Sequence, residues 1–469
     1  MKLLQILLNH ENISLEPNSY KSDSTFGTLI LKNMVCQSLV KLDATMTFQP
    51  DLATAWTVSP DHCVYTFDLA PDVRFHDGAA LDADTVVWNF QRLFDSLADS
   101  VLAKDFEGLE EVRALSVDRV EFRFLEPCMH FLHALAWRTH ITNDRLTQPI
   151  GTGPFRVVEW IRKSHIRLRR FEDYWEPGLP TVDEAIISWN PDPQERVSMI
   201  ERGEVDFVES VPPGAAARLQ EEGLIETAAV SSPRKTAIIF NTQEPPFNDI
   251  RMRYAVAHAV DRERLIEELF GGRGRMVNGV LPADDPWAVK LEAPELDLDR
   301  ARELVKEAGY AKGIKVKVDI TAVPPVPKAA QFVAKTLAKI GIDLDIREYT
   351  DPPWWPYLFL EGHRHMAFQG TSARPHPYLL FARDLLTDGP FNMGGYSNLK
   401  MDKLVSESRR TIDEQKQRDL YAEAQRLVHA DLPILPLWAA DVYCGWRPGL
   451  KGFYPHPLGY MDFARIIEE

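Results

Sequence analysis

Residues suited to binding an anion or a metal ion occur in two short stretches of the chain. The first is Ala373-Arg-Pro-His-Pro-Tyr378, in which Arg374 and His376 stand two positions apart. A guanidinium binds a carboxylate through two parallel hydrogen bonds, and an imidazole is a common metal ligand. The second is Trp137-Arg138, where the indole can stack on a ligand that the guanidinium holds. A surface Trp–Arg pair without a ligand is the alternative for this second stretch.

Known motifs of catalysis do not occur in the sequence. It contains no nucleophile elbow, HExxH motif, Walker loop or His/Cys/Asp constellation, and Asp384 and Asp388 have no partner that the sequence identifies. Gly151-Thr-Gly-Pro predicts a tight backbone corner rather than a phosphate cradle, because neither a helix start nor a lysine follows it. We therefore expect that the protein is not an enzyme, with a hydrolase as a distant alternative.

Composition indicates a globular protein with more than one lobe. The 469 residues exceed the size at which a single core stops growing, and 45% of them are hydrophobic. A formal charge of −16 argues against nucleic acid as a partner. The four cysteines are far apart in sequence and form no CxxC or zinc spacing, so we interpret them as buried thiols.

The elements that must position these residues differ between the two halves of the chain. In the first half, residues 63–69 and 119–125 alternate apolar and polar side chains, which predicts two half-buried strands. Between them, Asp82 is placed to cap a helix. In the second half, Asp249, Asp261 and Asp299 each precede a helical pattern. Residues 314–320 and 342–346 alternate around a helix through 332–337, which predicts a crossover unit with parallel strands.

Several stretches resemble the family-5 extracellular solute-binding proteins that serve dipeptide, oligopeptide and nickel importers. The resemblance extends over nearly the whole chain, and the motifs occur in the family's order. They are Pro50-Asp-Leu-Ala-Thr-Ala-Trp56, Tyr65-Thr-Phe-Asp-Leu69, Asp72-Val-Arg-Phe-His-Asp-Gly78, Asp82-Ala-Asp-Thr-Val86, Gly151-Thr-Gly-Pro-Phe155, Asp173-Tyr-Trp175, Pro191-Asp-Pro193, Gly203-Glu-Val-Asp-Phe207, Phe240-Asn-Thr242, Asp249-Ile-Arg251 and Val260-Asp-Arg262.

The resemblance implies an α/β fold of the two-lobed periplasmic-binding-protein type (cluster C), with a hinge between the lobes. The first lobe would comprise residues 1–240 with an inserted subdomain at about 35–170, the second lobe residues 241–436, and residues 437–469 would return to the first lobe. The hinge is expected near residues 240–246. Function would then be capture of a small solute by hinge closure, for import through an ABC transporter's membrane permease.

The loop around His376 differs in sequence from the corresponding loop of the peptide-binding members of this family. Those members usually carry an aspartate of an Asp-Pro-Asp type loop there, which pairs with the α-amino group of the peptide. Here Arg374 and His376 replace it, which suits an anionic or metal-bearing solute. The resemblance to the nickel branch implies that Arg138 holds a carboxylate of a small metal chelate. Nickel or a metal chelate is thus favoured, and a di- or oligopeptide remains the alternative.

The predicted ligand contacts combine this resemblance with residue type, and His376 is the predicted metal ligand. No cofactor is expected apart from a metal chelate bound as the ligand, and a monomer is expected. The predicted contacts are Tyr20, Trp137, Arg138, Arg374, His376, Tyr378 and Tyr396.

The family also implies a periplasmic or extracytoplasmic location. Residues 1–8 contain an apolar run that is too short for a signal peptide. We expect an exported protein whose signal has been removed. A cytosolic ligand sensor is the distant alternative, and it is disfavoured because the first lobe begins at once and the acidic charge opposes a DNA-reading module.

Overall fold

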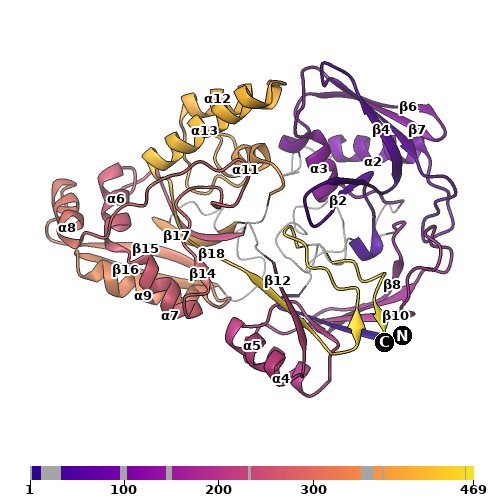
Figure 1. Ribbon diagram of the computed structural model, residues 1–469. Coiled ribbons are helices and arrows are strands. Elements are labelled where there is room, and N and C mark those ends of the chain that lie inside the picture. The colour runs from indigo at the N-terminus through magenta and orange to yellow at the C-terminus, as the bar shows by residue number, and fades with distance from the viewer. Residues whose placement is uncertain are drawn as a thin grey trace. The chain divides into compact units, whose positions relative to one another are not determined.

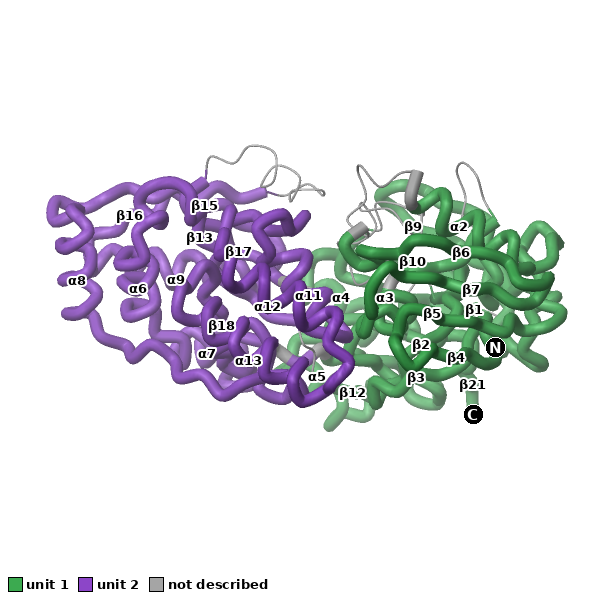
Figure 2. Tube along the Cα trace, turned by 90° about the horizontal axis from the view of Figure 1, so that it is seen from above, with its two compact units in different colours: residues 1–231, 442–469 green, residues 232–441 purple. Residues whose placement is uncertain are grey.

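The computed structural model describes residues 3–11, 33–95, 103–143, 150–230, 234–349, 364–371, 374–459 and 461–469. The chain divides into two compact units, which Figure 2 colours separately. Unit 1 comprises Met1–Ser231 and Val442–Glu469, and unit 2 comprises Ser232–Asp441. Because unit 1 contains both chain ends, the chain passes between the units twice.

The two crossings, at 231/232 and 441/442, differ from the positions that the sequence analysis predicted. Strand β13 (Lys235–Phe240) pairs with β17 (Met366–Thr371) and with β18 (Ile434–Ala440), so both β13 and β18 belong to the sheet of unit 2. The predicted boundaries at 240/241 and 436/437 would cut through this sheet. Strand β18, which contains the predicted boundary at 436/437, lies between β14 and β13 in the sheet of unit 2.

Unit 1 is built on a seven-stranded mixed sheet of order β12-β19-β11-β1-β10-β9-β8. Strand β1 lies between β10 and β11 and runs parallel to both, while the outer strands pair antiparallel. Figure 1 shows α4 and α5 side by side in this unit. The elements are β1 (Leu3–Leu8), β8 (Phe155–Ile161), β9 (His165–Arg170), β10 (Glu184–Trp189), α4 (Pro193–Glu201), β11 (Phe207–Val208), α5 (Pro213–Glu221), β12 (Glu226–Val230), β19 (Val442–Trp446), β20 (Leu450–Lys451) and β21 (Ile467–Glu468).

A four-stranded antiparallel sheet of order β4-β5-β7-β6 forms a second part of unit 1. Phe67, Phe122 and Phe131 pack edge-on or tilted in its core, with ring centroids 5.1–6.3 Å apart. Strands β8 and β9 belong to the large sheet, so the predicted subdomain boundary near residue 170 would cut through that sheet. Its elements are β2 (Val40–Leu42), β3 (Phe48–Pro50), β4 (Ala53–Val58), β5 (Val64–Leu69), α2 (Ala83–Asp95), η3 (Ala103–Phe106), β6 (Leu109–Ser116), β7 (Arg119–Phe124) and α3 (Phe131–Arg138).

Unit 2 contains a six-stranded mixed sheet of order β14-β18-β13-β17-β15-β16. Strands β15, β16, β17 and β18 run in one direction and β13 runs in the other. The predicted crossover unit is confirmed, since β15 and β16 pair in parallel around α9. The remaining elements are α6 (Ile250–Ala259), α7 (Arg262–Phe270), β14 (Gly274–Arg275), α8 (Leu298–Glu307), β15 (Ile314–Thr321), α9 (Val326–Ala338), β16 (Ile342–Tyr349), α11 (Pro377–Asp384), α12 (Leu399–Arg410) and α13 (Glu414–Asp431).

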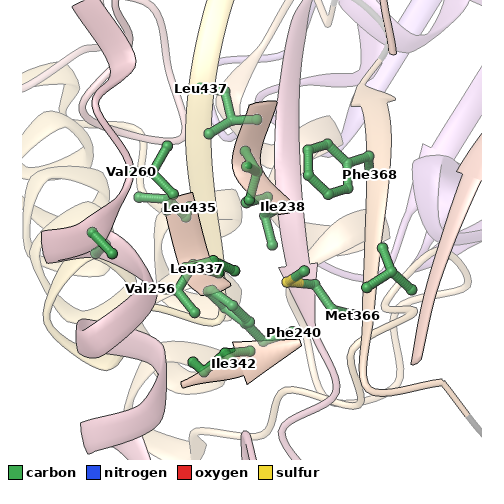
Figure 3. Packing of buried hydrophobic residues seen from close by; sticks show 14 of the residues in the cluster. Ile238, Phe240, Val256, Val260, Leu337, Ile342, Met366, Phe368, Leu435 and Leu437 are labelled. Atoms are coloured by element: carbon green, nitrogen blue, oxygen red, sulfur yellow. The ribbon is translucent and has the colours of Figure 1, made fainter. Parts of the chain in front are cut away.

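The main core of unit 2 lies between one face of this sheet and helices α6, α7, α8 and α9. Figure 3 shows Ile238 and Phe240 of β13 beside Leu435 and Leu437 of β18, with Val256 of α6 close by. All five side chains are at most 1% exposed. The predicted 3.6-residue and two-residue periodicities therefore identify the faces that pack together.

Most predicted helix starts are found where the sequence placed them. Asp82, Asp249 and Asp261 each accept a main-chain N–H with a side-chain oxygen at the start of α2, α6 and α7. The cap of α8 is Asp297, however, and Asp299 lies in its first turn. Within the described ranges, no helix combines the length and apolar character that a membrane span requires.

Candidate functional site

Four charged side chains converge at one edge of the six-stranded sheet of unit 2. Since β17 and β18 run opposite to β13, their carboxyl ends and the start of β13 lie at the same edge. Both chain crossings, at 231/232 and 441/442, also join unit 2 there. In open α/β sheets, ligands bind outside the carboxyl ends of the strands. We call Lys235, Asp285, Arg374 and Asp384 the charged cluster.

Arg374 and Asp384 form a largely buried ion pair in this cluster. The Arg374 Nη2 atom lies 3.1 Å from Asp384 Oδ1, and the two side chains are 7% and 10% exposed. Arg374 follows β17, and Asp384 ends α11, so one short helix sets their separation. The sequence analysis found no partner for Asp384, and the structure corrects this.

Lys235, the first residue of β13, brings a second buried cation to the cluster. Its side chain reaches almost no solvent, because the residue is 4% exposed. Burial lowers the pKa of Lys235 to about 8. The carboxylates of Asp384 and Asp285 raise this pKa, and the charge of Arg374 lowers it. The cations and carboxylates of the cluster therefore act on one another across little water, where charge interactions are strong.

Asp285 enters the cluster from the loop between β14 and α8. Burial raises the pKa of its carboxyl. Two effects lower this pKa: the N–H of Trp287 donates to Oδ1 at 2.8 Å, and the positive charge of Lys235 favours the carboxylate. Asp285 and Lys235 come from segments that the sequence analysis did not connect with the site. Lysine at the head of the apolar strand Lys-Thr-Ala-Ile-Ile-Phe was the one signal in the sequence, because a lysine is seldom buried unless it is paired.

His376 caps helix α11 beside the charged cluster. Its Nδ1 accepts the N–H of Tyr378 at 3.2 Å, and its ring packs against Trp287 and Tyr421 with centroids 5.3 and 5.8 Å apart. Among the described residues, no three His, Cys, Asp or Glu side chains are grouped as they would be around a metal ion. The role of His376 as a metal ligand stays a prediction.

Tyr378 lies in the first turn of α11, directly after the cap His376, whereas the remaining predicted contacts belong to other segments or lie outside the description. Tyr378 is 1% exposed, and Tyr396 donates its hydroxyl to Asp431 at 2.6 Å within unit 2. Trp137 is fully buried in unit 1. Tyr20 lies outside the described residues, as does the side chain of Arg138, whose main chain ends α3. Of the predicted set, the structure thus brings together Arg374, His376 and Tyr378.

Comparisons with known proteins identify the family. The family described as "Bacterial extracellular solute-binding proteins, family 5 Middle" matches residues 47–391. The glutathione-binding protein GsiB of Escherichia coli K12 is 27% identical over 466 residues, covering 95% of this chain and 90% of that protein. GsiB of Salmonella paratyphi A is 28% identical over 468 residues, with the same coverage.

Solved structures of solute-binding proteins share the fold over the full length of the chain. DppA of Helicobacter pylori, in complex with the peptide STSA, has a TM-score of 0.90 and 25% identity, covering 100% of this chain and 98% of that one. NikA of Staphylococcus aureus, in complex with Ni(L-His)2, has a TM-score of 0.88 and 20% identity, with 100% of both chains covered. The two-lobed α/β fold is confirmed. The chain belongs to the family-5 bacterial extracellular solute-binding proteins and is the substrate-binding component of an ABC importer.

Proposed function

We propose that the protein captures a small solute that carries a carboxylate, and that the charged cluster of unit 2 contacts this group. The observation that carries the proposal is the buried Arg374–Asp384 pair with Lys235 beside it. A guanidinium offers two parallel donors to a carboxylate, and a buried ammonium adds attraction that water screens little. Asp384 and Asp285 oppose the loss of the Lys235 proton that burial favours.

Two classes of solute carry this chemistry, and relatives of both kinds are known. GsiB proteins are named for glutathione and the Helicobacter pylori DppA structure holds a peptide, whereas the Staphylococcus aureus NikA structure holds a histidine complex of nickel. Glutathione, peptides and histidine all present carboxylates. The sequence analysis favoured the metal chelate because Arg374 and His376 replace an aspartate. The relatives support a short peptide equally well.

Binding measurements with one probe from each class test the proposal. Protein freed of co-purified ligand by unfolding and refolding would be titrated calorimetrically with reduced glutathione, Met-Leu and Ni(L-His)2. Native mass spectrometry with metal analysis on gently purified protein would identify what is bound in the cell. Binding of glutathione or Met-Leu indicates a peptide importer, and binding of the nickel complex indicates a chelate importer. If none of the three probes bound, the proposal would be wrong.

Substitution of Arg374 tests the part played by the cluster. We expect Arg374→Met to lower the affinity for the bound probe about tenfold to a hundredfold, because a hydrogen bond to a charged group contributes about 1.5–3 kcal/mol. Arg374→Lys keeps the charge but loses the two-point contact, so its effect should be intermediate. Arg264→Met is the matched control, since this arginine is 69% exposed on α7 of the same unit. Unchanged affinity in a folded Arg374→Met protein would remove Arg374 from the site.

A further inference from the structure

Two cysteines that are distant in sequence meet in the four-stranded part of unit 1. Cys63 directly precedes β5, and Cys128 lies between β7 and α3. The N–H of Phe124 donates to the carbonyl of Cys63 at 2.8 Å, and the N–H of Cys128 donates to the carbonyl of His62 at 3.1 Å. The peptide group that joins His62 to Cys63 is therefore hydrogen-bonded directly to Cys128.

This backbone contact places the two cysteines within reach of a disulfide. The register of β5 and β7 places Phe124 opposite Cys63, and Cys128, beyond the end of β7, contacts the peptide group that enters Cys63. Disulfides span Cα separations of roughly 4.4–6.8 Å. Cys63 and Tyr65 share a strand face because they are two positions apart. Tyr65 donates its hydroxyl to the carbonyl of Cys128 at 2.7 Å, so this face is the one that covers Cys128.

A buried histidine, His130, lies beside the thiol of Cys128. The Nε2 atom of His130 lies 2.9 Å from the main-chain carbonyl of Asp105. Since a carbonyl only accepts, Nε2 carries the hydrogen and Nδ1 presents its lone pair. The Sγ atom of Cys128 lies 3.7 Å from that Nδ1 and 3.9 Å from Nε2, so the thiol is in contact with the ring. Cys128 and His130 are both fully buried, whereas Cys63 is half-buried, so a reagent in solution reaches Cys63 first.

We propose that Cys63 and Cys128 form an intramolecular disulfide by thiol–disulfide exchange with a dialkyl disulfide. The Cys63 thiolate attacks one sulfur of the reagent, whose S–S bond breaks and releases one thiol. His130 Nδ1 then accepts the proton of Cys128, whose thiolate attacks Cys63 Sγ and displaces the second thiol. Two cysteines are oxidised and one disulfide is reduced to two thiols. Proteins of this family act outside the cytoplasm, where disulfides persist.

Peptide mapping of the full chain after treatment with hydroxyethyl disulfide tests the proposal. We expect a proteolytic fragment that joins the Cys63 and Cys128 peptides, with two of the four cysteines still reactive toward an alkylating reagent after unfolding. Cys63→Ser and Cys128→Ser should each abolish the joined fragment. Cys36→Ser is the matched control, because Cys36 is equally buried, and it should leave the fragment unchanged.

Substitution of His130 separates proton transfer by this residue from mere closeness of the two cysteines, because only the former changes the rate of the second exchange. In His130→Gln, the mixed disulfide on Cys63 should persist longer before the second exchange, so the rate of joining falls while the rate of the first step does not. The oxidised protein should also melt at a higher temperature than the same protein reduced with dithiothreitol. The proposal is overturned if the wild-type protein stops at the mixed disulfide, or if Cys36 or Cys444 supplies the partner sulfur.

Discussion

Replacing Asp51 by asparagine should change how the stability of unit 1 depends on pH. Asp51 belongs to the Pro-Asp-Leu-Ala motif and is 7% exposed. Its carboxylate accepts the N–H of Ser38 at 3.0 Å and the Nε2 of Gln37 at 2.8 Å, and Lys41 Nζ lies 4.0 Å away. Burial outweighs these contacts and raises the pKa of Asp51 from 3.8 to about 6.

The sign and size of the effect follow from proton linkage. Between about pH 4 and pH 6 the folded protein holds a proton on Asp51 that the unfolded chain has released, so this residue makes folding less favourable as pH rises through that interval. A shift of about 2 units corresponds to about 3 kcal/mol, which applies in full at pH 7. Asparagine does not ionise. The free energy of unfolding of Asp51→Asn, minus that of wild type, should therefore rise by about 3 kcal/mol from about pH 4 to pH 7.

Subtraction is necessary because buried histidines in the same unit act in the opposite direction. Burial lowers the pKa values of His76, His133 and His456 to about 4, so their contribution to stability is lost as pH falls below about 6.5. These terms are present in both proteins and cancel in the difference. Urea unfolding followed by circular dichroism at several pH values supplies the measurement.

An exposed aspartate gives a control of opposite sign. Hydrogen bonds from Ser59 and Cys63 lower the pKa of Asp61, so its carboxylate adds stability above its ordinary pKa and loses it in acid. The difference between Asp61→Asn and wild type should therefore fall as pH rises toward about 4 and stay constant above it, where Asp51 titrates. A difference for Asp51→Asn that stayed constant across the interval would refute the assignment of a burial-raised pKa.

Three further substitutions test the packing by chemical denaturation. Arg262→Met should lower the free energy of unfolding by about 2–4 kcal/mol, since the buried guanidinium holds two main-chain carbonyls at 3.0 Å that would lose their donor. Gly151→Ala should lower the free energy of unfolding by more than about 3 kcal/mol or prevent folding, because an added Cβ would overlap the carbonyl oxygen of Val35. Gly214→Ala is the control and should be tolerated, because no atom lies within 4 Å of the Cβ that it adds. Phe122→Ala, in a fully buried aromatic cluster, should cost about 3–5 kcal/mol, and a loss below about 1 kcal/mol would contradict that burial.

Periodicity predicted the regular elements well because each of them buries one face. The alternation at 314–320 and 342–346 became β15 and β16 in parallel, and the apolar helical pattern after Asp82 became α2. The lobe boundaries could not be located in this way. Strands β13 and β18 are apolar on both faces, so nothing in their own sequence shows which sheet they join.

The candidate site was only half predicted, for a physical reason. Arg374 stood out because it replaces an expected acidic residue, but its partner Asp384 lies one helix away, and the distance between them depends on that helix. Lys235 and Asp285 reach the cluster through the sheet and through a long loop. Contacts between distant segments are set by the tertiary fold, so composition and local spacing did not reveal them.

The residues that show the family are occupied with holding the fold together. Arg253 and Arg262, in and beside the motifs after residue 249, donate to main-chain carbonyls, and Gly151 leaves no room for a side chain. Asp249 caps a helix. None of the four residues of the charged cluster lies in a motif that carried the resemblance. Membership in the family therefore follows from structural residues, whereas the chemistry of the solute has to be inferred from side chains outside them.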